Sequence, residues 1–326
     1  MWSLMEEEPE AYNMLKALLI ASRPKTLALA LAGPIVAAAM ASIMFHWDKK
    51  IFLLHILTAI LLQVLSNFAN DYGDFVKGTD QKAKRKDRAL TAGIITQESM
   101  KKVLRVTVFL TLVSGLFLLK ESFAADRFYF IGFFILGIAA IAAAIKYTVG
   151  KSPYGYRSLG DIMVFLFFGP VAIAGGFYLH THSINLDIFM LSAAFGLLSV
   201  AVLNINNIRD IESDLASNKK TIANSFGKAK AISYQRFLLY GAWVLNVVVL
   251  FTRQIAIWGG HKPEFKELAL LPIVFLPFLI LYMFHLSSLK NCETRAQYNT
   301  QLRNISLLTL ALAIYWGGIN NLLFTL

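Results

Sequence analysis

The stretch that decides the fold is residues 51–80, IFLLHILTAILLQVLSNFANDYGDFVKGTD. Its first part, residues 51–69, is mostly apolar and matches the ~20 residues that a helix needs to cross a lipid bilayer. Its second part, Asn70–Asp80, places an asparagine and three aspartates directly at the end of that helix. Carboxylates beside lipid are costly and usually functional. The stretch therefore predicts a membrane-spanning helix and a polar site at its end.

Apolar stretches of similar length recur along the 326-residue chain. Hydrophobic residues make up 57% of it and charged residues only 16%, whereas soluble domains carry ~25% charged residues. A backbone in lipid must satisfy its own hydrogen bonds, so these stretches are expected to be helices. We predict an all-α integral membrane protein with nine transmembrane helices. They lie at about residues 26–45, 51–69, 103–119, 128–146, 162–179, 188–206, 237–251, 268–286 and 305–326.

Lysine and arginine residues give the expected orientation. With the N-terminus in the cytoplasm, 24 of the 31 lie on the cytoplasmic side and seven on the other, as the positive-inside rule requires. The net charge of +11 is explained by this bias and by contact with anionic lipid, without nucleic-acid binding. Residues 1–21 are expected to form an N-terminal cytoplasmic segment without a cleaved leader. Residues 22–326 are expected to form a single transmembrane domain.

Two cytoplasmic loops, after the second and the sixth predicted helix, hold most of the aspartates. Both contain amide and carboxylate side chains spaced three and then four residues apart, which places them on one face of a helix. These positions are Asn67, near the end of the second predicted helix, with Asn70 and Asp74 after it, and Asn207, Asp210 and Asp214 after the sixth. Each loop is therefore expected to present a row of oxygen atoms at the cytoplasmic end of a helix.

Two facing rows of oxygen atoms suit a divalent cation, because a bound cation offsets the repulsion between carboxylates. Oxygen ligands without paired Cys or His favour Mg²⁺ over Zn²⁺. Two rows could hold two ions with a diphosphate between them, and the neighbouring Lys and Arg residues would supply further positive charge. The alternative is that these residues are ordinary solvated loop charges. That alternative must explain two clusters with the same spacing on the same face of the membrane.

Two motifs, NDYGDFVKGTD and NNIRDIESD, resemble the paired aspartate-rich motifs of the UbiA superfamily of intramembrane prenyltransferases. Within it, the resemblance is to the branch that uses 1,4-dihydroxy-2-naphthoate. Four further stretches point to this branch: SRPKTL (Ser22–Leu27), LTAGIIT (Leu90–Thr96), YTVGKSPYGYRSLGD (Tyr147–Asp161) and KKTIANSFG (Lys219–Gly227). The resemblance runs from about Ser22 to Gly227 and is sparse beyond that.

This resemblance implies nine transmembrane helices around a central cavity, capped by the aspartate-rich loops on the cytoplasmic side of the cell inner (plasma) membrane. It implies Mg²⁺ dependence and an isoprenyl diphosphate donor. The implied acceptor is 1,4-dihydroxy-2-naphthoate, which gains the polyprenyl chain and loses its carboxyl group as CO₂ to give demethylmenaquinone.

The resemblance also implies roles for individual residues. The first choices as Mg²⁺ ligands are Asn70, Asp74, Asp210 and Asp214. The second choices are Asp71, which could instead act as a base, and Asp80. The expected diphosphate-binding residues are Lys77, Arg88, Arg209 and Lys219. Side chains expected to face the cavity are Arg23, Lys25, Asn67 and Asn207. Tyr147 is either a membrane anchor or a hydroxyl near the diphosphate.

One departure concerns the stretch after Thr221, which reads IANSFG where an arginine is expected. The missing contact could be supplied by Lys220 or Lys228.

Three alternatives remain open at this point. Another aromatic acceptor, such as 4-hydroxybenzoate or homogentisate, would leave the same sequence pattern. An ion-coupled transporter also places Asp and Asn in membrane helices, but near the bilayer midplane and not beside basic loops. A non-catalytic membrane protein would not need aspartates in both motifs.

Overall fold

The structure is a computed structural model that describes residues 10–44, 46–82, 88–257 and 272–324. Eight helical segments in these ranges are long and apolar enough to cross a membrane. They are α2 (Pro24–Ile43), α3 (Lys49–Val76), α5 (Gln97–Phe123), α6 (Arg127–Lys146), the continuous run of α7 (Gly160–Leu166), η2 (Phe167–Gly175) and α8 (Gly176–Thr181), α9 (Leu186–Arg209), α12 (Lys228–Ile257) and α15 (Arg295–Phe324). A shorter apolar helix is α14 (Leu276–Lys290), and α1 (Glu10–Ser22) precedes them all.

The all-helical membrane architecture is confirmed, but several predicted boundaries differ. The second helix continues into the aspartate motif as far as Val76, and the third begins at Gln97 rather than at residue 103. The last helix begins ten residues early, at Arg295, because its first turns are polar and carry no hydropathy signal. The start predicted for the eighth helix, residue 268, lies outside the described residues, and α14 begins at Leu276.

Several helices begin at a side chain that satisfies free backbone N–H groups, as helix N-caps do. Asp48 accepts hydrogen bonds from Lys50 N and Ile51 N at the start of α3. Thr96, Asp126 and Asn185 do the same for α5, α6 and α9. These caps fix where the apolar segments start and therefore which residues reach the two membrane surfaces.

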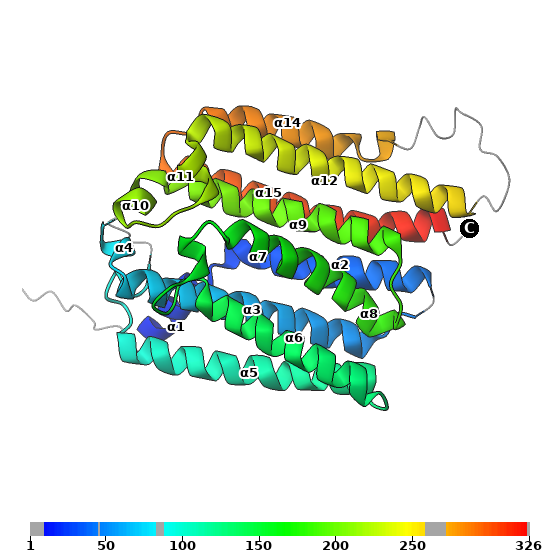
Figure 1. Cartoon of the computed structure of the whole chain (residues 1–326), viewed down its shortest axis with the longest axis horizontal. Coiled ribbons are helices and arrows are strands. Elements are labelled where there is room, and N and C mark those ends of the chain that lie inside the picture. Colours follow the sequence, from blue (N-terminus) through cyan, green and yellow to red (C-terminus); the bar gives the residue numbers. More distant parts are fainter. Residues whose placement is uncertain (1–9, 45, 83–87, 258–271, 325–326) are drawn as a thin grey trace, which may run out of the picture.

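The helices lie roughly parallel, and α9 is the most deeply buried of them (Figure 1). It packs against α12, α15 and η2, and α15 packs against α2. On the other side, α3 packs against α2, α5 and α6, while α6 is largely exposed. The shorter helices α4 (Thr79–Lys82), α10 (Ile211–Ala216) and α11 (Ile222–Phe226) gather at one end of the bundle, which we term the polar end (Figure 1).

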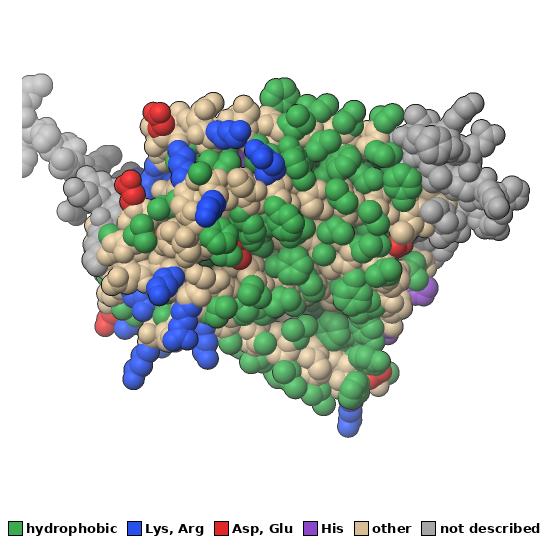
Figure 2. Space-filling model, turned by 45° about the horizontal axis from the view of Figure 1, so that its top comes forward, with side chains coloured by type: hydrophobic (Ala, Val, Ile, Leu, Met, Phe, Trp, Pro, Cys, Tyr) green, Lys and Arg blue, Asp and Glu red, His purple; other side chains and the backbone are tan. Residues whose placement is uncertain are grey.

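The surface follows the same division. Hydrophobic side chains cover the middle of the visible face, and Lys and Arg side chains gather towards the polar end (Figure 2). Large exposed apolar side chains on α5, α6 and α14 include Phe109, Phe128 and Phe284. An apolar belt with charges at its ends is what a lipid bilayer requires of a multi-pass membrane protein.

Close packing of η2 against α9 depends on small residues. A Cβ atom on Gly169 would lie 2.4 Å from the Ser192 carbonyl oxygen and 3.1 Å from Gly196 Cα. We expect Gly169→Ala to destabilise the protein by about 1–3 kcal/mol, as overpacking does, seen as a lower midpoint in thermal unfolding in detergent. The matched control is Gly132→Ala on α6, where a Cβ meets nothing within 4 Å. Equal midpoints for the two variants would contradict this packing.

Candidate functional site

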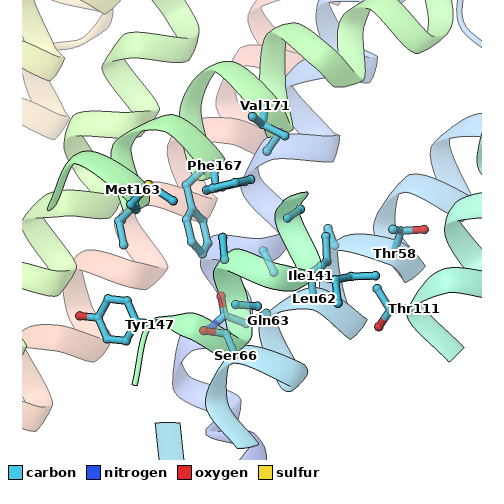
Figure 3. Close-up of a pocket in the computed structure, with 18 of the residues that line it drawn as sticks. Thr58, Leu62, Gln63, Ser66, Thr111, Ile141, Tyr147, Met163, Phe167 and Val171 are labelled. Atoms are coloured by element: carbon cyan, nitrogen blue, oxygen red, sulfur yellow. The ribbon is translucent and has the colours of Figure 1, made fainter. Parts of the chain in front are cut away.

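A cavity of about 340 Å³ runs along α3 between that helix and α5, α6 and the α7–η2–α8 run. One face of α3 lines it from His55 to Asp74, which is about 28 Å at the rise of an α-helix. Its walls are mainly apolar, with Tyr147, Met163 and Phe167 reaching in from other elements (Figure 3). Its charged residues lie at the polar end.

The first cluster lies as the spacing predicts, with Asn67, Asn70 and Asp74 all lining the cavity from one face of α3. The hydroxyl of Thr148, two residues after the end of α6, donates towards the Ala69 carbonyl oxygen at 2.9 Å and Asn70 Oδ1 at 3.1 Å. A Cβ on Gly73 would lie 2.6 Å from Thr148 Oγ1, so glycine allows this close approach. The contact fixes the end of α3 against the end of α6.

The second cluster does not lie on one continuous helix, which corrects the spacing argument. The helix α9 ends at Arg209, Asp210 has φ −104° and ψ 12°, and Asp214 belongs to the separate helix α10. Asp210 lines the cavity, and so does Asn206 on α9, whereas Asn207 is buried away from the cavity.

Two loops distant in sequence are joined at the polar end by a short parallel pairing. Ser158 N donates to Lys220 O at 2.9 Å, and Lys220 N donates to Tyr156 O at 3.2 Å. The pairing brings the Tyr156 hydroxyl to Asp74 Oδ1 at 2.9 Å. It also places the Lys219 ammonium 5.6 Å from the Tyr156 ring centre and 3.4 Å from Asp214 Oδ1. The two aspartate motifs and the Tyr147–Asp161 stretch thus meet at one site.

Arg88 links two of the three carboxylates of the first motif, Asp74 and Asp80. It lies 3.7 Å from Asp74 Oδ2 and 3.7 Å from Asp80 Oδ2, and all three side chains are buried. Gly78, with φ 73°, turns the chain after α3 so that α4 brings Asp80 back beside Arg88. Asp80 therefore lies off the cavity wall and contacts Arg88, which is on it.

Asp210 is held by two arginines. Arg209 lies 2.6 Å from Asp210 Oδ2, and Arg295, at the start of α15, lies 2.8 Å from Oδ1. Arg295 therefore places a positive charge beside Asp210. Of the two lysines expected near this stretch, Lys220 is exposed and the Lys228 ammonium donates to the Cys292 carbonyl oxygen at 2.9 Å.

Electrostatics at the polar end follow from burial and from neighbouring charges. Burial raises the pKa of Asp214 to about 6; the nearby Lys219 lowers it, while Asp210 and Asp74 raise it. Burial alone would lower the pKa of Lys219, but the surrounding acidic groups, chiefly Asp214, outweigh it and raise that pKa. Burial raises the pKa of Tyr147 to about 12. Lys219 therefore stays charged, and Tyr147 stays a neutral phenol.

The donor set fits a magnesium ion that also binds substrate. Among the described residues no three His, Cys, Asp or Glu side chains form a metal-binding group by themselves. Mg²⁺ in phosphate sites is usually held by only one or two carboxylates, with waters and phosphate oxygens as its other ligands. Asp74 and Asp210 line the cavity, and the buried Asp214 Oδ2 accepts no hydrogen bond from the described residues. Repulsion among these carboxylates would fall if a cation bound between them.

Other predicted residues lie around the cavity but not on its wall. Lys25 is exposed, and Lys77 lies with its ammonium 5.2 Å from the Tyr156 ring centre. The cavity wall includes the predicted residues Arg23, Asn67, Asn70, Asp74, Arg88, Tyr147, Asp210 and Lys219. It does not include Lys25, Asp71, Lys77, Asp80, Asn207, Arg209 and Asp214.

Sequence reasoning missed several polar residues of this region. They are Gln63, Ser66 and Asn206 on the cavity wall, and Arg295 beside Asp210. The helical period of α3 could have found Gln63 and Ser66, since they continue the face of Asn67 and Asn70 towards the membrane centre. No sequence signal marked Arg295, which follows the last motif by almost seventy residues.

Comparison with known proteins gives a consistent result. Residues 26–308 match the UbiA prenyltransferase family. The chain is 45% identical over 240 residues to the 1,4-dihydroxy-2-naphthoate octaprenyltransferase of Escherichia coli, covering 73% of this chain and 77% of that protein. It is 34% identical over 243 residues to the protein of that name from Mycobacterium tuberculosis, covering 73% and 79%.

Among solved structures, the fold resembles that of a UbiA homolog from Archaeoglobus fulgidus bound to GPP and Mg²⁺. The TM-score is 0.61 at 15% identity, and the alignment covers 93% of this chain and 99% of that one. A likeness at this identity concerns the arrangement of the helices.

Proposed function

Because the chain belongs to the UbiA prenyltransferase family, we propose that it transfers a polyprenyl chain from an isoprenyl diphosphate to 1,4-dihydroxy-2-naphthoate. The acceptor gains the prenyl chain and loses its carboxyl group as CO₂, which gives a prenylated naphthoquinol, the reduced form of demethylmenaquinone. The relatives from E. coli and M. tuberculosis support this acceptor by name. Family identity also argues against the transporter and non-catalytic alternatives.

One observation carries the chemistry. Asp74, Asp210 and Lys219, from three separate parts of the sequence, line the polar end of a cavity whose remaining walls are mostly apolar. A diphosphate needs positive charge and metal ligands, and an isoprenyl tail needs an apolar channel. This cavity offers a charged end and an apolar channel along one helix, α3. Ordinary solvated loop charges would not be joined to an apolar channel.

Donor binding would place the diphosphate at the polar end. Lys219, Arg88 and Arg23 line the cavity there and would pair with its oxygens, since charge-assisted hydrogen bonds to phosphate are among the strongest that proteins make. The bond between the allylic carbon and the diphosphate oxygen breaks, and the electron pair leaves with the oxygen. Positive side chains placed where this charge develops stabilise the transition state.

A magnesium ion would be held by Asp74, Asp210 and Asn70, with Asp214 beside them. When bound, it would neutralise the negative charge of the diphosphate leaving group. We propose Mg²⁺ as the resident metal because its preference for oxygen ligands and phosphate matches this donor set.

The apolar walls would protect the allylic cation until the acceptor ring attacks it. Water in the cavity would instead hydrolyse the donor, and a site enclosed by membrane helices excludes it. The neutral Tyr147 lies at the boundary between the charged end and the apolar walls, with its ring 5.4 Å from that of Tyr154. Its hydroxyl is suited to donate a hydrogen bond, and its ring face to stabilise a nearby cation.

We propose that the polar end faces the cytoplasm of a cell inner membrane. The bias of lysine and arginine residues towards this end supports that orientation. It would expose the diphosphate site to soluble Mg²⁺ and leave the prenyl tail within the bilayer.

The test is an assay with the purified protein, Mg²⁺, a radiolabelled isoprenyl diphosphate and a panel of aromatic acceptors. We expect a prenylated naphthoquinol and an equal amount of CO₂ from 1,4-dihydroxy-2-naphthoate, and no product from 4-hydroxybenzoate or homogentisate. Transfer to one of the other acceptors in preference to dihydroxynaphthoate would contradict the proposed acceptor while leaving the prenyltransferase chemistry intact.

A further inference from the structure

Gln63 is a polar residue of the cavity wall for which the proposed donor chemistry has no use. It projects from the middle of α3 into the space that Phe167 and Tyr147 enter from other elements (Figure 3). Seven residues separate it from Asn70, which is about 10 Å along the helix. An amide at this depth in a membrane is costly unless it has hydrogen-bond partners.

The hydrogen bonds around Gln63 fix which atom of its amide faces which partner. Asn67 Nδ2 donates to the Ser22 carbonyl oxygen at 2.8 Å, and a carbonyl only accepts, so Asn67 must present its oxygen to Gln63. Gln63 Nε2 donates to this Asn67 Oδ1 at 3.3 Å. The Thr26 hydroxyl donates to the Arg23 carbonyl oxygen, so it accepts from Gln63 Nε2 at 3.2 Å.

Both N–H groups of the Gln63 amide are thereby committed, and turning the amide over would lose both bonds. Its Oε1 is the remaining atom. That oxygen is buried and has no hydrogen-bond donor in the part of the chain that the structure describes. A buried acceptor without a donor is costly, so a ligand that brings an O–H group to this oxygen is favoured.

Only one part of the two substrates can supply such a donor. An isoprenyl tail has no O–H group, and the diphosphate and the acceptor's carboxylate present oxygens that accept. The ring hydroxyls of the acceptor donate. The 1-hydroxyl lies next to the carboxylate and donates to it within the molecule, which leaves the 4-hydroxyl free.

Building on the proposed function, we propose that Gln63 Oε1 accepts a hydrogen bond from the 4-hydroxyl of the aromatic acceptor. This bond positions the ring between the diphosphate-binding end and Gln63 and makes Gln63 a specificity residue for a hydroquinone. The network of Ser22, Asn67 and Thr26 holds the amide in the orientation that the bond requires.

The experiment compares 1,4-dihydroxy-2-naphthoate with its two monomethyl ethers, in the wild type and in Gln63→Met. A 4-methyl ether cannot donate to Gln63, so we expect its kcat/KM in the wild type to be about 10- to 100-fold below that of the parent. In Gln63→Met, the ratio of kcat/KM for the parent to kcat/KM for the 4-methyl ether should fall towards one. We expect this change to arise from the KM for the acceptor, while the KM for the donor stays near its wild-type value. The 1-methyl ether should show no such dependence on Gln63.

The matched control is Gln301→Met, which removes an amide that is hydrogen-bonded to His285 outside the cavity and should keep the full discrimination. The proposal would be overturned if the preference for the parent over its 4-methyl ether, measured as the ratio of their kcat/KM values, were the same in the wild type and in Gln63→Met. If Gln63→Met fails to fold, the wild type alone decides: equal kcat/KM for the two ethers would overturn it. No product from dihydroxynaphthoate in the wild type would overturn the proposed function itself, and this proposal with it.

Discussion

Replacing Asp74 by asparagine is expected to lower the rate of prenyl transfer by about 10²–10³-fold, the cost of removing one electrostatic contact to a transition state. Asp74 lies on the cavity wall, 3.7 Å from Arg88, and accepts a hydrogen bond from the Tyr156 hydroxyl at 2.9 Å. Asparagine keeps the size of the side chain and an oxygen for the Tyr156 hydroxyl. The change therefore removes charge and metal affinity with little change in packing.

The measurement is the initial rate at saturating donor and acceptor over a range of Mg²⁺ concentrations, where we also expect the half-saturating concentration to rise. Glu212→Gln is the matched control, because it makes the same carboxylate-to-amide change at an exposed position of α10. Thermal unfolding in detergent separates lost activity from lost fold. A rate and Mg²⁺ requirement equal to those of the Glu212→Gln control would contradict the assignment of Asp74.

Asp210→Asn is expected to have an effect of similar size, because Asp210, directly after α9, faces the same end of the cavity. If the two carboxylates act as one unit, the double variant should be only slightly slower than either single one. Simple multiplication of the two losses would indicate independent roles.

Replacing Lys219 by methionine is the second change with a large expected effect, again about 10²–10³-fold in kcat/KM. Lys219 is buried, lies 3.4 Å from Asp214 Oδ1 and lines the cavity beside both aspartates. The surrounding acidic groups raise its pKa despite burial, so it keeps a full positive charge for the diphosphate. Methionine retains the unbranched apolar stem, without the terminal ammonium and its charge.

The adjacent lysine provides the control for this change. Lys220 is exposed and takes part in the loop pairing only through its backbone, so Lys220→Met should retain activity close to that of the wild type. Inorganic diphosphate, a product of the reaction, should inhibit the Lys219→Met variant less strongly than the wild type. A larger loss of activity in Lys220→Met than in Lys219→Met would contradict the placement of the diphosphate.

The sequence predicted those parts of the site that depend on local periodicity. Asn67, Asn70 and Asp74 share a face of α3 because positions three and four apart always do on a helix. The same spacing in the second motif led to a wrong prediction of one continuous helical face, since α9 ends at Arg209 and Asp210 breaks the helix. Which of two identical spacings remains helical depends on packing at the polar end, and that information is not local.

The meeting of the two aspartate motifs was predicted, but the individual contacts between other distant segments were not. Arg295 reaches Asp210 because α15 begins beside the end of α9, and its sequence is that of an ordinary basic residue. Asp80 finds its partner only when Gly78 turns the chain back to Arg88. In the sequence, Gln63 is one polar residue in an apolar helix. Only the hydrogen bonds from its Nε2 to Asn67 and Thr26 show that its Oε1 remains available to accept from a ligand.

The central claim is that the two aspartate motifs form one metal and diphosphate site at the end of the cavity. The most direct measurement is an experimental structure with Mn²⁺ in place of Mg²⁺ and an isoprenyl thiodiphosphate, with the metal located by anomalous scattering. We predict an anomalous peak between Asp74 and Asp210, in contact with the diphosphate, and the prenyl tail extending along α3 towards His55. A peak held by one motif alone, or a diphosphate bound away from Lys219, would contradict the account.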